Sequence, residues 1–102
     1  MDFLQHWYLS NCDGDWEHEF GVRIETLDNP GWTVEVDLVD TRLEGRLLSR
    51  TKLEPGAGRW VWVESDGRHF SSSCDPLSLQ VALQRFRAFA ELPAAEAGPG
   101  AG

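Results

Sequence analysis

Hydrophobic side chains near the N-terminus follow a helical spacing. In the segment 2–11 the large apolar residues fall at the first, second, fifth and sixth positions of a run: Phe3, Leu4, Trp7 and Tyr8. This spacing places them on one stripe of a helix. The segment 11–14 consists mainly of residues that favour turns, so we expect a short helix that ends there.

From Phe20 onward apolar and polar residues alternate, which is the period of a β-strand. Two such segments, 20–26 and 32–38, flank the turn sequence Asp-Asn-Pro-Gly of residues 28–31, and together they predict a hairpin. The even-numbered residues of both segments would face inward. Because paired residues share a face, the loop should contain an odd number of residues, three or five.

Three more strands are predicted in the second half of the chain, over 45–53, 59–64 and 68–72, with glycine-containing turns between them. In the first of these, one face carries Leu47, Ser49, Thr51 and Leu53, and the other carries Arg46, Leu48, Arg50 and Lys52. We expect this basic row to lie opposite the acids Glu35 and Asp37.

The second of these strands places Trp60 and Trp62 on one face and Val61 and Val63 on the other. One of these pairs must be exposed or covered by another element, and the pattern does not decide which. The remaining tryptophans of the apolar faces, Trp7 and Trp32, are expected in the core.

The last predicted element is a helix with Asp75 as its N-cap, Pro76 at its first position and Pro93 at its end. We therefore predict an α+β fold, in which an antiparallel sheet of four to five strands forms a meander and the N-terminal and C-terminal helices pack on one face. Residues 1–92 would form this single domain. Residues 93–102, mostly Ala, Gly and Pro, would be a disordered tail.

Charge adds information because it is unevenly distributed. The 102-residue chain has a formal net charge of −8. Residues 1–44 contain 11 acidic residues and two arginines, whereas residues 45–102 contain six acidic and seven basic residues. An acidic half disfavours nucleic acid and anionic membranes as partners and favours encounter with a basic protein, although acidic charge also serves solubility alone.

The chain has no segment typical of a secretion signal or a membrane span. Its two cysteines, Cys12 and Cys74, are too few for a disulfide framework and lack metal-site or redox spacing. We expect a cytoplasmic protein that is monomeric when free, with both thiols reduced.

The stretch CDGDWEHE, residues 12–19, concentrates chemically active side chains. Its alternating acids resemble the start of a calcium loop, but His18 stands where that loop needs glycine and Ile24 where it needs an acid. The histidines of the chain are too scattered for a zinc site. We therefore predict no metal site and no cofactor.

Glu17 and His18 are a candidate acid–base pair, yet the chain has no nucleophile elbow, phosphate-binding loop or dinucleotide motif. We predict that the protein is not an enzyme and has no catalytic residue. A small metal-dependent hydrolase that uses this pair is one alternative, and a small-ligand module that uses an exposed Trp60 or Trp62 is another. Trp16 is either an anchor for a partner or a lid over the core.

Two blocks of the sequence resemble the immunity protein 53 family: WYLSNCDGDWEH, residues 7–18, and GVRIETLDNPGW, residues 21–32, followed by the acidic strand to Asp40 and Thr41. The resemblance extends over residues 3–91 and is densest over 7–41. Members of this family are bacterial proteins thought to protect a cell from a toxin encoded beside them. The resemblance implies a stoichiometric inhibitor of a toxin with a basic surface, such as a nuclease, with no catalysis and no cofactor.

The matching blocks also imply a contact surface. Its candidate residues are Asp13, Asp15, Trp16, Glu17, His18, Asp28 and Asn29. Turn chemistry alone would select the same residue types in the hairpin loop, and Glu17 and His18 would equally serve to stabilise the fold. Contact and structural roles are both open at this point.

Overall fold

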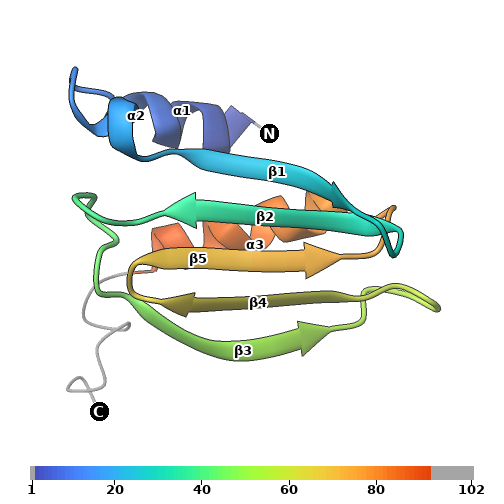
Figure 1. Ribbon diagram of the computed structural model, residues 1–102. Helices are drawn as coiled ribbons and strands as arrows, with labels where there is room; N and C mark the ends of the chain where they lie inside the picture. Colours follow the sequence, from blue (N-terminus) through green and yellow to red (C-terminus); the bar gives the residue numbers. More distant parts are fainter. Residues whose placement is uncertain (1, 93–102) are drawn as a thin grey trace, which may run out of the picture.

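Five strands form one antiparallel sheet, and the helices lie behind it and beside one of its edges (Figure 1). The computed structural model describes residues 2–92, so the predicted tail lies outside the described residues. In chain order the elements are α1 (Asp2–Asn11), α2 (Trp16–Glu19), β1 (Val22–Leu27), β2 (Gly31–Asp37), β3 (Leu47–Leu53), β4 (Val61–Asp66), β5 (His69–Cys74) and α3 (Leu79–Glu91).

The strand order is β1-β2-β5-β4-β3. The α+β class is confirmed, but the sheet is not a simple meander, because β5 inserts between β2 and β4. Glu35 and Asp37 therefore lie opposite Ser71 and His69 of β5, and not opposite the basic row of β3. A strand that is charged on one face is better tolerated at an edge of a sheet, and β3 is one of the two edge strands.

The β1–β2 hairpin has the predicted parity. Leu27 pairs with Gly31, which leaves three residues in the loop. Gly31 is required for packing, since a Cβ atom at this position would lie 2.4 Å from the carbonyl oxygen of Cys74. The loop sequence thus provides both the turn and the close approach of β2 to the end of β5.

Strand β3 contains a bulge that changes which side chains face inward. Leu48 lies opposite Ser65 and Thr51 opposite Val63, so β3 has one residue more than β4 over this stretch. As a result Leu47 is 68% exposed and Leu48 is half-buried, which is the reverse of the prediction from simple alternation.

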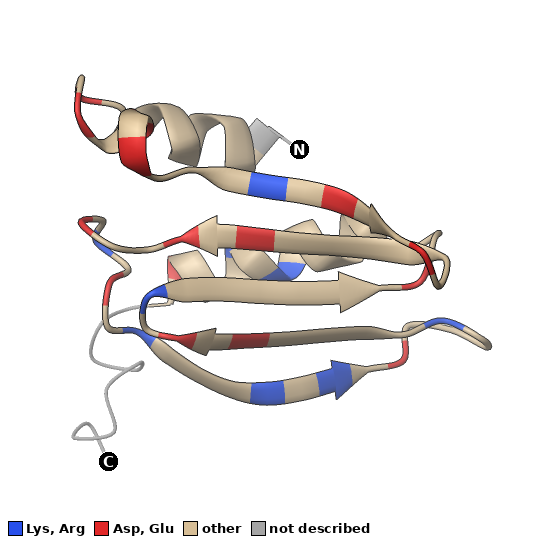
Figure 2. Cartoon of the chain, in the orientation of Figure 1, with Lys and Arg blue, Asp and Glu red and all other residues tan. Residues whose placement is uncertain are grey.

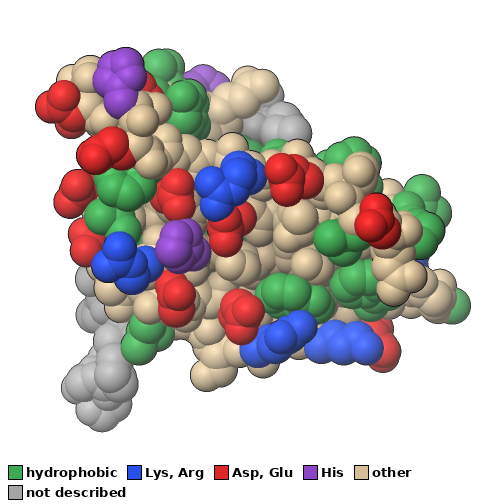
Figure 3. Space-filling view, viewed as in Figure 1, with side chains coloured by type: hydrophobic (Ala, Val, Ile, Leu, Met, Phe, Trp, Pro, Cys, Tyr) green, Lys and Arg blue, Asp and Glu red, His purple; other side chains and the backbone are tan. Residues whose placement is uncertain are grey.

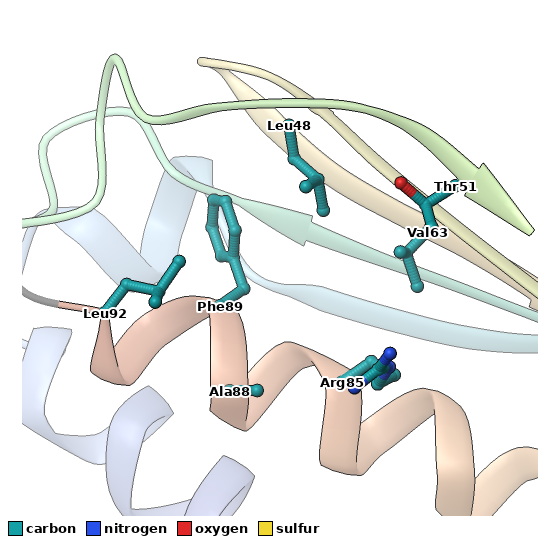
Figure 4. Close-up of a pocket in the computed structure, with 7 residues that line it drawn as sticks. All are labelled: Leu48, Thr51, Val63, Arg85, Ala88, Phe89 and Leu92. Carbon is teal, nitrogen blue, oxygen red and sulfur yellow. The ribbon is translucent and has the colours of Figure 1, made fainter. Parts of the chain in front are cut away.

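A shallow apolar groove of about 180 Å³ separates this part of β3 from α3. Leu48 and Val63 of the sheet face Phe89 and Leu92 at the end of α3 (Figure 4). The groove lies on the helix-covered side of the sheet.

The core lies between the sheet and the helices. Val61 and Val63 are buried on the face covered by α3, so Trp60 and Trp62 lie on the opposite, open face. Trp7 is buried and its ring packs edge-on against Phe86 at 5.1 Å between centroids, which joins α1 to α3. Trp32 is half-buried, and its Nε1 donates a hydrogen bond to the carbonyl oxygen of Pro76.

Arg46 was expected in an outward basic row, but it is buried. Its guanidinium donates hydrogen bonds to the carbonyl oxygens of Phe89 at 3.1 Å and Leu92 at 2.8 Å. The last carbonyl groups of a helix have no partner within the helix, so Arg46 caps the end of α3 from the loop before β3.

Helix α3 begins at Leu79, later than the predicted start at Pro76. Asp75 is therefore not its N-cap. Its carboxylate accepts hydrogen bonds from the backbone N–H of Trp60 and of Leu77 and from the hydroxyl of Ser78, and it pairs with Arg59 at 3.2 Å. Asp75 thus joins β4, β5 and the entry of α3.

Both cysteines are free, and Cys74 is buried in the core. None of the helices in the described part of the chain has the length and apolar character needed to cross a membrane.

Burial opposes ionisation of Asp75, but hydrogen bonds from Ser78, Trp60 and Leu77 and the charge of Arg59 lower its pKa from 3.8 to about 2. A carboxylate whose pKa is lower in the folded state stabilises the fold above its unfolded pKa, and this stabilisation is lost as the pH falls through about 2. Asp75→Asn should therefore lower the free energy of unfolding at pH 7. The same substitution should also reduce the amount of stability that the protein loses between neutral pH and about pH 2.

Urea denaturation at a series of pH values measures both effects. Glu54→Gln, at an exposed carboxylate, is the matched control and should leave the pH dependence unchanged. An Asp75→Asn variant whose acid sensitivity equals that of the wild type would contradict this account.

Candidate protein interface

The loop between α1 and α2 is held by two of the candidate carboxylates. Asp13 Oδ1 accepts hydrogen bonds from the backbone N–H of Asp15 and of Trp16, each at 2.9 Å. The carboxylate of Glu17 accepts from the N–H of Asp13 at 2.9 Å and of Gly14 at 2.8 Å. This reciprocal arrangement resembles a capping box and orders the entry of α2.

Hydrogen bonds from backbone N–H groups lower the pKa of both carboxyls. In Asp13 the largest contribution comes from Trp16, followed by Asp15. In Glu17 it comes from the residue's own N–H, with Asp13 and Gly14 adding to it against the opposing effect of burial. Asp13 and Glu17 are therefore ionised at neutral pH, and their oxygens bind the loop backbone. This favours a structural role for Glu17 over that of a general base.

Trp16 is 4% exposed. Its ring packs against Trp7, Tyr8 and Phe20, with centroids 5.9 to 6.2 Å apart. Its Nε1 donates a hydrogen bond of 2.9 Å to the carbonyl oxygen of Val39. The side chain is thus a lid of the core and presents almost no surface to a partner, which favours the structural alternative for this residue.

The remaining residues of this block are exposed. Asp15 precedes α2 and its side chain makes no capping hydrogen bond, while His18 and Glu19 lie on α2 and are exposed. Among the described residues no group of three or more His, Cys, Asp or Glu is arranged to hold a metal ion.

Asp28 and Asn29 are exposed in the β1–β2 loop, at the far end of β1 from α2 (Figure 1). A strand of six residues spans about 20 Å. The candidate contact residues therefore fall into two groups at opposite ends of the sheet and do not form one cluster.

The fold instead brings other acidic residues to the α2 end. The loop 38–46 is tied to α2 by the Trp16–Val39 hydrogen bond. The same loop meets the β4–β5 turn, where Leu38 N–H donates to Arg68 O and Gly45 N–H donates to Gly67 O, both at 2.8 Å. Three segments far apart in sequence thus meet at one end of the sheet.

We call this region the acidic end. It contains Asp13, Asp15, Glu17, Glu19, Asp37, Asp40, Glu44 and Asp66, against the exposed Arg42 and Arg68 and the buried Arg46 (Figure 2). The sequence block of residues 13–19 supplies half of these acids. From the sequence, the other acids were harder to recognise as part of a site. Asp37, Asp40 and Glu44 counted only toward the acidic first half, and Asp66 lay in a predicted turn of the second half.

Five carboxylates of the acidic end accept hydrogen bonds from the backbone: those of Asp13, Glu17, Asp37, Glu44 and Asp66. Glu44 accepts from the N–H of Asp40, whose φ of 63° is in the left-handed region. Asp66 accepts from the N–H of Arg68 and of His69, each at 2.8 Å, and these bonds lower its pKa. A large part of the negative charge is therefore held in fixed positions before any partner binds.

The contrast between Trp16 and Asp15 gives a direct test. Trp16→Ala removes a buried ring and should lower the free energy of unfolding by about 3–5 kcal/mol. Asp15→Ala, one residue away and exposed, should change it by less than about 0.5 kcal/mol. Urea denaturation of the two variants measures the difference. A cost below about 1 kcal/mol for Trp16→Ala would contradict its place in the core.

The comparison with protein-family models agrees with the resemblance read from the sequence. No curated protein and no solved structure matches the chain at a significant level. The model of one protein family, described as immunity protein 53, matches residues 1–91. Because this match covers nearly the whole chain, the protein belongs to the immunity protein 53 family.

Proposed function

We propose that this protein neutralises a cognate bacterial toxin by binding it stoichiometrically, and that the acidic end is a principal contact surface. Membership of an immunity protein family supports the inhibitory role. The fixed carboxylates of the acidic end support a partner with a basic surface, such as a nuclease. The protein would act without catalysis or cofactor, as a cytoplasmic monomer until it meets the toxin.

The roles of the candidate residues differ within this proposal. Asp15 and His18 are exposed and would contact the toxin directly. Asp13, Trp16 and Glu17 would position them by ordering the loop around α2. Asp28 and Asn29 would form a second contact at the other end of β1, within the reach of an interface that covers about 800 Å² of each protein.

The acidic end would also determine how fast the complex forms. Complementary charge can raise an association rate to about 10⁸–10⁹ M⁻¹s⁻¹ at low salt. The same charge would repel nucleic acid and anionic membranes, so neither is a proposed partner. For a nuclease toxin, the carboxylates would occupy the positive surface that otherwise attracts the phosphates of its substrate.

Co-expression with the protein encoded beside this one tests the inhibitory role. The wild-type chain should restore growth to cells that make the neighbouring toxin, and the two proteins should purify as a complex of fixed stoichiometry. A variant unable to fold, such as one with several buried aromatic residues replaced by alanine, is the negative control. Absence of both rescue and complex would refute the proposal.

Charge reversal tests the contribution of the acidic end to association. Asp15→Lys should slow association by roughly two- to fivefold at low salt, and the difference should shrink as salt screens the charges. The matched control is Glu54→Lys, which makes the same change in net charge at an exposed position at the far end of β3. Stopped-flow mixing measures both rates. Equal rates for the two variants would remove the claim of local steering.

A further inference from the structure

The face of the sheet away from α3 is not covered by any element of the described chain (Figure 3). The pairing register arranges its outward side chains in rows across the strands. One row consists of Arg23, Glu35, Ser71 and Glu64. The next row consists of Glu25, Thr33, Ser73, Trp62 and Lys52. We call this surface the open face.

The open face carries a tryptophan, Trp62, that is not part of the buried core. Trp62 is half-buried on β4, and the Val61 and Val63 side chains beside it fill the helix-covered side. The guanidinium carbon of Arg50 lies 3.9 Å from the centre of the Trp62 ring, a cation–π contact. The ring can therefore hold a guanidinium group, and tryptophan is among the commonest energetic anchors of protein interfaces.

Two carboxylates lie close to this ring. Glu64 is two residues from Trp62 on the same strand and face, and makes no ion pair within the described residues. Glu35, which pairs with Arg23, lies on the other side of Ser71 in the same row. Two strand spacings separate the backbones of Glu35 and Glu64 by about 10 Å. A short serine side chain between two long carboxylates leaves room for the cation of a partner.

The size of the open face suggests that it is part of a larger interface. Five strands at about 4.8 Å and six residues at about 3.3 Å give a surface of roughly 20 by 20 Å. This is about half of the 800 Å² per partner typical of a stable complex. The open face continues into the acidic end through His69, whose Nε2 lies 3.4 Å from Asp37 Oδ1 and whose Nδ1 lies 3.8 Å from Asp66 Oδ2.

We infer that the toxin binds across both surfaces, and that an arginine- or lysine-bearing segment of the toxin lies over β4 and β5 of the open face. Its cation is held between Glu64 and Glu35, and a neighbouring side chain packs on Trp62. This inference rests on the proposed function and adds to it the second surface and the chemistry of the segment that binds there. The open face carries Arg23, Arg50 and Lys52 as well as Glu25, Glu35 and Glu64, so its net charge does not select an occupant. A cationic side chain is selected by Glu64, which has no ion pair among the described residues, and by the continuity of this face with the acidic end.

Two substitutions on the open face test this inference, with the neighbouring toxin as the probe. Glu64→Lys and Trp62→Ala should each raise the Kd of the complex at least fivefold, measured by calorimetry. The matched controls are Glu54→Lys and Leu77→Ala, at exposed positions off this face, and each should change the Kd less than twofold. A change smaller than fivefold in either open-face variant overturns the inference.

A measurement on the wild type keeps the test valid if a variant does not fold. The indole N–H signal of Trp62 in a ¹H–¹⁵N spectrum should shift or broaden when the toxin is added. That of Trp7, which is buried and packs on Phe86 of α3 on the helix-covered side, is the internal reference. An unchanged Trp62 signal in a formed complex overturns the inference and leaves the proposed function intact, whereas absence of any complex overturns both.

Discussion

The buried indole of Trp16 is the contact on which the acidic end depends. Its ring packs on Trp7 of α1, and Trp7 in turn packs on Phe86 of α3, so one aromatic chain joins the three helices. Its N–H binds the carbonyl of Val39 and so fixes the start of the loop that leads from β2 to the far edge of the sheet. Since a buried N–H without a partner is costly, the loop and α2 are ordered together.

Fixing many carboxylates at one end of a small protein has an electrostatic cost, because like charges repel. The structure offsets this cost locally. Asp13, Glu17 and Asp66 each accept hydrogen bonds from backbone N–H groups, which favour the ionised form. Glu44 accepts one such bond from the N–H of Asp40. The same bonds order the loops on which the exposed acids lie. Stability of these loops and readiness for a basic partner therefore have one physical origin.

Several features of the fold could be predicted because they depend on local rules. Alternation predicted the strands, and shared parity predicted that the loop between them has an odd number of residues, three or five, of which the structure has three. The place of β5 between β2 and β4 was not predictable from alternation, since any antiparallel neighbour satisfies the same period. The bulge in β3 and the capping of α3 by Arg46 also escaped prediction. Both arise from contacts between residues far apart in the chain.

The candidate site divides in the same way. The sequence by itself determined the acidic block of residues 13–19, the uneven charge and the family to which the chain belongs. Only the tertiary structure decided that Trp16 is buried, that Asp28 and Asn29 lie at the other end of the sheet, and that Asp66 joins the acidic end. The physical reason is that charge and motifs can be read from neighbouring residues in the chain. The burial of a side chain and the spatial neighbours of a charge depend on the order of the strands, which is set by packing between residues far apart in the chain.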